Sequence, residues 1–111
     1  MKEDKIYLLN ILEAIEKIET YTVSGKDKFI KSTLIQDGVI RNLEIIGEAT
    51  KRISPDLKEQ HTDIPWKQMA GLRDVLIHDY MGVDLEIAWN VVCRELPKVK
   101  SKVKGLFKNF L

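Results

Sequence analysis

Apolar residues recur along most of the chain every three or four positions, which is the spacing of one face of an α-helix. Four segments carry this pattern: about Asp4 to Thr22, about Lys28 to Ile53, near Pro65 to about His78 or Asp79, and Leu85 through Val103. No stretch alternates at the period of two that marks a half-buried strand. The pattern therefore predicts an all-α, up-and-down bundle of four to five helices.

The ends of these segments carry the residues that start and stop helices. "SGKDK" supplies turn chemistry after the first segment, and "SPDLKEQHTD" breaks the chain after the second. Asp63 or Thr62 is a candidate cap for the third helix, with Pro65 in its first turn. Asp84 is a candidate cap for the fourth helix, which Pro97 should kink or split in two.

Composition places this bundle among ordinary globular proteins. The 111 residues are 44% hydrophobic and 32% charged, which predicts one domain over residues 1–111. A formal net charge of +1 gives no global basic signature, so any nucleic-acid contact requires a local patch. The single cysteine, Cys93, and an N-terminus that resembles neither a signal peptide nor a membrane span predict a cytoplasmic protein.

Two glycines interrupt the helical pattern, and each leaves two readings open. Gly47 and Gly71 should each cost about 1 kcal/mol relative to alanine in a helix interior. They are either tolerated at exposed sites or required because another backbone approaches closely. At Gly71 the approaching helix could come from a second subunit.

The segment "GLRDVLIHDYMGVD" places ionisable residues inside an apolar run. If it is one helix, Arg73, Ile77 and Tyr80 share a face, whereas His78 lies about 140° away from Arg73. Arg73 and His78 could then act on one target only if the helix ends near His78 or if a two-fold axis joins two subunits. A purely structural reading also fits: an arginine paired with a carboxylate, a histidine at a helix end and a packed tyrosine.

Longer stretches around this segment resemble a known family. "IPWKQMAGLRDVLIHDYMGVDLEIAW" and "VIRNLEIIGEATKRI" are similar to the HepT-like toxins, a branch of the HEPN superfamily of small helical ribonucleases. The family's mark is an arginine, four residues, a histidine, one residue and a tyrosine, which here fall on Arg73, His78 and Tyr80. Many members have asparagine after the arginine, where this chain has Asp74.

The resemblance implies a HEPN-like bundle and a prokaryotic, metal-independent endoribonuclease toxin of a type VII-like toxin–antitoxin module, with no cofactor. Arg73 and His78 would be catalytic, with Asp74 supporting them, in a cleft lined by both subunits of a homodimer. The implied partner, besides RNA, is an MntA-like nucleotidyltransferase antitoxin that attaches AMP to Tyr80. The rival interpretation is a non-catalytic helical interaction or nucleotide-binding module whose Arg–His–Tyr segment serves assembly.

Other residues carry weaker signals. Glu44 and Glu48 could bind a metal, but nearby basic residues favour surface ion pairs. Cys93 is expected in the core, Trp66 and Trp89 are expected to anchor packing, and His61 has nothing to suggest that it is a ligand. A basic tail offers the best local patch for RNA phosphates, although a solvated helix face explains it more simply: Lys98, Lys100, Lys102, Lys104 and Lys108.

Overall fold

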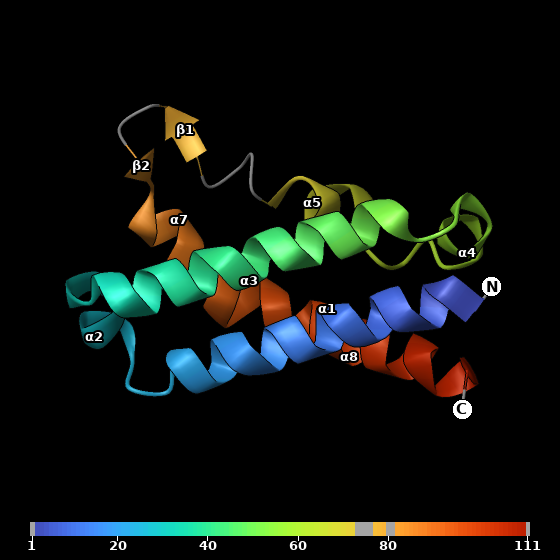
Figure 1. Ribbon diagram of the computed structural model, residues 1–111, viewed down its shortest axis with the longest axis horizontal. Helices are drawn as coiled ribbons and strands as arrows, with labels where there is room; N and C mark the ends of the chain where they lie inside the picture. Colours follow the sequence, from blue (N-terminus) through green and yellow to red (C-terminus); the bar gives the residue numbers. More distant parts are fainter. Residues whose placement is uncertain (1, 73–76, 80–81, 111) are drawn as a thin grey trace.

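The computed structural model describes residues 2–72, 77–79 and 82–110, and its architecture is dominated by two long helices that lie side by side (Figure 1). These are α1 (Lys2–Tyr21) and α3 (Thr33–Arg52). Behind them, α8 (Leu96–Phe107) packs on α1, so three helices enclose the core. The predicted all-α, HEPN-like bundle is confirmed.

Shorter elements connect and flank these helices. A two-stranded antiparallel ladder pairs Ile77 with Val83 and Asp79 with Gly82. The remaining elements, in chain order, are α2 (Lys26–Lys31), α4 (Pro55–Gln60), α5 (Trp66–Ala70), β1 (Ile77–Asp79), β2 (Gly82–Val83), α7 (Leu85–Asn90), the π-helical segment η1 (Val91–Glu95) and the 3₁₀ turn η2 (Lys108–Phe110).

The core is built from the apolar stripes that the sequence pattern predicts. Each large aliphatic side chain removed from water contributes about 1.5–3 kcal/mol, so these stripes are what hold α1 against α3. The buried members of the two stripes are Leu8, Ile11, Leu12, Ile15 and Ile18 on α1 and Val39, Leu43, Ile46 and Ala49 on α3.

The second predicted helix is two helices, because the chain breaks at Ser32. Ser32 has an extended backbone, and its hydroxyl accepts a hydrogen bond from the Ile35 N–H at 3.2 Å, which caps α3. The segment "SPDLKEQHTD", which was expected only to interrupt the chain after the second helix, forms α4. There Ser54 caps the helix through the Leu57 N–H, and Pro55 occupies the first turn.

Ser54 also joins α4 to the start of α1. Its backbone N–H and its hydroxyl donate to the two carboxylate oxygens of Asp4 at 2.8 and 2.7 Å. Burial alone would raise the pKa of Asp4, but the hydrogen bonds from Ser54 outweigh it and hold this pKa below its ordinary value. The charged form of Asp4 therefore fastens the two helix starts together.

The third and fourth predicted helices differ from expectation in informative ways. The third begins only at Trp66, so neither Asp63 nor Thr62 caps it, and it does not reach His78, which lies on strand β1. The fourth is capped by Asp84, as predicted, through the Ile87 N–H at 3.1 Å. It is divided into α7, the π-helical segment η1 and α8 without a break, because the junction residues keep helical backbone angles, and Pro97 lies in the first turn of α8.

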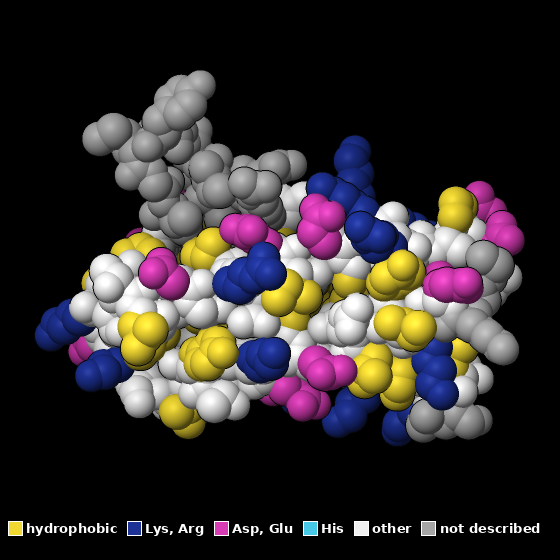
Figure 2. Space-filling model, viewed as in Figure 1, with side chains coloured by type: hydrophobic (Ala, Val, Ile, Leu, Met, Phe, Trp, Pro, Cys, Tyr) yellow, Lys and Arg dark blue, Asp and Glu magenta, His cyan; other side chains and the backbone are white. Residues whose placement is uncertain are grey.

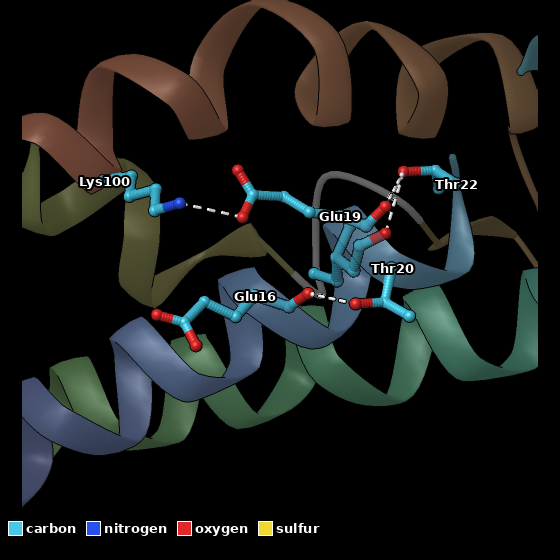
Figure 3. Close-up of polar contacts among 6 residues, drawn as sticks. Glu16, Glu19, Thr20, Thr22 and Lys100 are labelled. Carbon is cyan, nitrogen blue, oxygen red and sulfur yellow. Dashed lines mark hydrogen bonds and ion pairs between the residues drawn. The ribbon is translucent and has the colours of Figure 1, made fainter.

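A polar contact ties α8 to the end of α1. The Lys100 ammonium donates to the Glu19 carboxylate at 2.9 Å, and this hydrogen bond raises the pKa of Lys100 (Figure 3).

Elsewhere acidic and basic side chains are interspersed over the face formed by α1 and α3 (Figure 2). No helix in the described part of the chain is long and apolar enough to span a membrane.

Candidate active site

The segment with the family motif falls between α5 and β2. Arg73, Asp74 and Tyr80 lie outside the described residues, so their assignment to the site stays a prediction. His78 is placed by its backbone alone, in the middle of strand β1. The motif therefore does not lie on one continuous helix, and the 140° separation expected between Arg73 and His78 on such a helix does not apply.

The described residues on both sides of the motif are firmly held. On the N-terminal side, the Gly71 N–H closes the end of α5 by donating to the Lys67 carbonyl at 3.1 Å, and Leu72 is 9% exposed. On the C-terminal side, β2 leads directly into the Asp84 cap of α7. The described neighbours of the motif segment are thus a buried leucine on one side and a capped helix on the other.

The position of α5 depends on a close backbone approach at Gly47. A Cβ atom at this position would lie 3.2 Å from the Ala70 carbonyl oxygen and 3.5 Å from that of Met69. The sharper of the two readings for Gly47 is therefore correct, and the approaching backbone belongs to α5 of the same chain. Gly71 has a different role, because it ends α5. A Cβ atom placed there would lie at an ordinary contact distance, 3.5 Å from the Lys67 carbonyl oxygen.

A surface hollow of about 470 Å³ lies beside this contact, which we call the α3 groove. Ala70, the last residue of α5, forms part of its wall together with Gly47. Its charged lining comes entirely from α3 and carries both signs: Arg41, Glu44, Glu48, Lys51 and Arg52. The α3 groove thus reaches the end of α5, which precedes the motif segment in the chain. These five side chains are its described charged groups.

One carboxylate of the α3 groove, that of Glu48, forms a surface ion pair. Glu48 lies 3.5 Å from the Lys51 ammonium, one helical turn away. Within the described ranges, no three histidine, cysteine, aspartate or glutamate side chains group as a metal site would require. The interpretation of Glu48 as an ion-pair residue is confirmed.

The cysteine and the two tryptophans singled out in the sequence have defined surroundings. Cys93 was expected in the core but is exposed, because the π-helical segment changes the phase of the helix around it. Trp66 is an anchor, as predicted, and donates from its indole N–H to the His61 carbonyl at 2.9 Å. Trp89 packs its ring on Phe29 with centroids 5.3 Å apart.

The basic tail is not a uniform solvated face. Lys100 is paired with Glu19, whereas the Lys102 ammonium donates to the Asp63 carbonyl at 2.7 Å. Lys98 and Lys102 line a second hollow, together with Lys58 and Lys67 from elsewhere in the chain. Sequence reasoning missed these last two, because only the tertiary fold brings α4 and α5 to the side of α8.

Comparison with known proteins decides the family. The family model described as "Ribonuclease HepT-like" matches residues 11–106, which is most of the chain. The chain belongs to the HepT-like ribonuclease family.

Individual relatives agree with this assignment. The chain is 46% identical over 109 residues to "Probable ribonuclease HepT" of Thermococcus cleftensis, covering 96% of this chain and 98% of the relative. It is 38% identical over 109 residues to "Putative RNase TTE0752" of Caldanaerobacter subterraneus, covering 97% of each chain. The HepT-like assignment thus rests on near-complete overlap.

A longer relative matches over only part of its length. "Gamma-glutamylcyclotransferase and putative RNase MJ0434" of Methanocaldococcus jannaschii is 48% identical over 103 residues, which cover 92% of this chain but 46% of the relative. The HepT-like chain therefore spans about half of that protein. No solved structure matches the chain.

Proposed function

We propose that this chain is a metal-independent endoribonuclease, the toxin of a type VII-like toxin–antitoxin module acting in the cytoplasm, with residues 1–111 as one domain. Arg73 and His78 are its catalytic residues. The observation that carries the proposal is the family match across residues 11–106 together with the intact Arg73, His78 and Tyr80 motif. The position of His78 on β1 supports it, since the helical geometry that would keep Arg73 and His78 apart is absent.

The reaction needs only groups that the motif and RNA supply. The RNA 2′-hydroxyl attacks the neighbouring phosphorus, so that a bond from O2′ to phosphorus forms while the bond to O5′ breaks. His78 removes the 2′-hydroxyl proton or protonates the leaving O5′, because an imidazole titrates near neutral pH. Arg73 binds the phosphate through its fork of donors and stabilises the charge that develops.

Asp74 supports the histidine in this scheme. An ionised aspartate accepts hydrogen bonds and donates none, so it cannot bind the phosphate as an asparagine could. It can accept a hydrogen bond from the imidazole of His78 instead and so orient that ring.

Two copies of the chain complete the site. Acid and base roles need two proton-transfer groups, and a homodimer with both motifs in one cleft supplies a histidine from each subunit. The partner that silences the toxin is an MntA-like nucleotidyltransferase, which attaches AMP to Tyr80. A bulky anion beside Arg73 would occupy the position of the RNA phosphate and repel its approach.

Cleavage of a defined oligoribonucleotide tests the catalytic proposal. Wild type should produce 2′,3′-cyclic phosphate and 5′-hydroxyl ends in the presence of EDTA, and His78→Ala should abolish cleavage while the far-ultraviolet circular dichroism stays unchanged. Arg73→Lys should also be strongly impaired, because a point charge does not reproduce bidentate contacts. Fragments with 5′-phosphate ends would indicate metal-activated water instead. Intact RNA with folded wild type would favour the non-catalytic interaction module.

Intact mass after co-expression with the nucleotidyltransferase tests the switch. Wild type should gain the mass of one or more AMP groups and lose RNase activity, whereas Tyr80→Phe should stay unmodified and active. Tyr21→Phe is the matched control, since Tyr21 is 40% exposed at the C-terminal end of α1, outside the motif, and its loss should leave modification intact. An adduct that persists in the Tyr80→Phe chain would place the switch on another residue.

A further inference from the structure

A hollow of about 560 Å³ separates α5 from α8, and we call it the lysine hollow. One wall carries Lys67 of α5, and the other carries Lys98 and Lys102, which are one turn apart on α8. Lys58, from α4, contributes a fourth ammonium group. Two consecutive helices, α4 and α5, and the distant helix α8 thus bring lysines to one place.

The charges in the lysine hollow are not balanced. Four lysines line it against two carboxylates, those of Asp63 and Glu95. None of the four forms an ion pair with another described residue, unlike three lysines elsewhere that do: Lys26 with Glu86, Lys51 with Glu48 and Lys100 with Glu19. In a chain whose net charge is only +1, this is a local excess that a bound anion could neutralise.

The walls of the lysine hollow are held in place by hydrogen bonds. The Lys102 ammonium reaches across to the Asp63 carbonyl at 2.7 Å, which joins α8 to the loop before α5. Trp66 is 8% exposed and is fixed by its 2.9 Å bond to the His61 carbonyl. The lysines therefore project from a rigid frame, so little ordering of the backbone is needed when an anion binds.

We propose that the lysine hollow binds the phosphate backbone of the single-stranded RNA substrate. This inference rests on the proposed ribonuclease function. Because α5 has five residues, about 7 Å separates its start at the lysine hollow from its end at the α3 groove, beside the motif segment. A strand seated on the lysines is thus led along α5 toward the site. Lysine ammonium groups are point charges without base preference, so they would hold the backbone while the motif cuts it.

Binding can be measured separately from cleavage with a short 2′-O-methyl oligoribonucleotide, whose blocked 2′-oxygen cannot attack. Its fluorescence anisotropy is titrated with the full chain at several salt concentrations. The test variant carries Lys58→Gln, Lys67→Gln and Lys98→Gln. The matched control carries Lys28→Gln, Lys31→Gln and Lys104→Gln, which remove three exposed lysines that do not line the lysine hollow.

The test variant should bind at least about tenfold more weakly at low salt, and its slope of log K against log salt should shrink by about 2, at about 0.7 for each lost single-strand contact. The control variant should keep both the affinity and the slope within about twofold of wild type. Equal losses in both variants would overturn the proposal, because the lysines would then act only as a diffuse charge. Displacement of the oligonucleotide by polyglutamate at lower concentration than by unlabelled RNA would also overturn it in favour of an acidic protein.

Cleavage of unmodified RNA separates this inference from the proposed function. If wild type binds but does not cleave, while the test variant loses binding, the ribonuclease proposal fails and the lysine hollow remains an RNA site. If wild type cleaves and the test variant cleaves with unchanged kcat/KM, the lysine hollow is overturned and the ribonuclease proposal stands. Melting temperatures of both variants equal to that of wild type confirm that the fold is intact in either case.

Discussion

The two flanks of α5 differ in how closely they are packed against the neighbouring helix. Toward α3, the helix is in backbone contact, since the Ala70 carbonyl would lie 3.2 Å from a Cβ at Gly47. Toward α8, it faces a hollow of about 560 Å³ that is bridged by hydrogen bonds such as that from Lys102 to Asp63. One flank is closed and fixes the position of the helix, and the other is open.

The charges on the two flanks differ in the same way. Glu48 and Lys51 form an ion pair on the α3 side at 3.5 Å, whereas the four lysines that line the lysine hollow have no described ion-pair partner. The charge of a side chain that pairs within its own helix is partly balanced before a ligand binds. An unpaired side chain at the wall of a hollow can form its ion pair with a bound anion. This difference supports the proposal that the α3 flank positions α5 and that the α8 flank binds an anion.

Gly47→Ala should have the largest effect of the changes on these flanks. Its Cβ meets a backbone oxygen at the end of α5, which cannot rotate away, so the free energy of unfolding should fall by about 1–3 kcal/mol, as for other overpacked sites. Displacement of α5 should also lower RNA cleavage in folded protein. Urea denaturation and the cleavage assay measure the two effects.

Gly105→Ala is the matched control for this change. Gly105 is exposed on α8, and a Cβ there meets no described atom within 4 Å, so alanine should raise the free energy of unfolding by about 0.5–1 kcal/mol. Opposite signs for the two glycines are expected. If Gly47→Ala also stabilised the protein, the close approach of α5 would not constrain the fold.

Trp66→Phe tests the open flank and should have a smaller effect. Phenylalanine keeps most of the ring packing but cannot donate to the His61 carbonyl, so stability should fall by about 1 kcal/mol. Urea denaturation measures this loss. A loss matching the 3–5 kcal/mol or so of large-to-small aromatic truncations would mean that the ring packing, and not the hydrogen bond, holds this flank.

The helical periodicity was sufficient to predict the fold because burial follows it directly. The stripes on α1 and α3 are buried where the spacing places them. The breaks were harder: the apolar period runs across Ser32, and only a local side-chain hydrogen bond to the Ile35 N–H ends one helix and starts the next. The serine and proline that open α4 are a recognisable cap signature, and they could have revealed that helix.

The site was predictable only as a list of residue types. The wrong assignment of Cys93 to the core shows why, since in the π-helical turn Val91 and Leu96 are both buried although they are five residues apart, and Cys93 between them is exposed. The lysine hollow depends on where α4, α5 and α8 meet, and no periodicity within one helix encodes that meeting. The family motif was visible in the sequence, but the strand that carries His78 was not.

The Glu48–Lys51 pair should show the smallest effect, and it provides the sharpest check on the comparison of charges. Both side chains are more than half exposed and three residues apart on one helix, so a double-mutant cycle with Glu48→Gln and Lys51→Gln should give a coupling free energy below about 0.5 kcal/mol. Because Lys51 lines the α3 groove and not the lysine hollow, Lys51→Gln should leave the salt dependence of oligonucleotide binding unchanged, unlike Lys98→Gln in the lysine hollow. Salt titrations of the two single variants decide this. If Lys51→Gln reduced the slope as much as Lys98→Gln, RNA would contact the α3 groove as well, and the functional distinction between the two flanks of α5 would be lost.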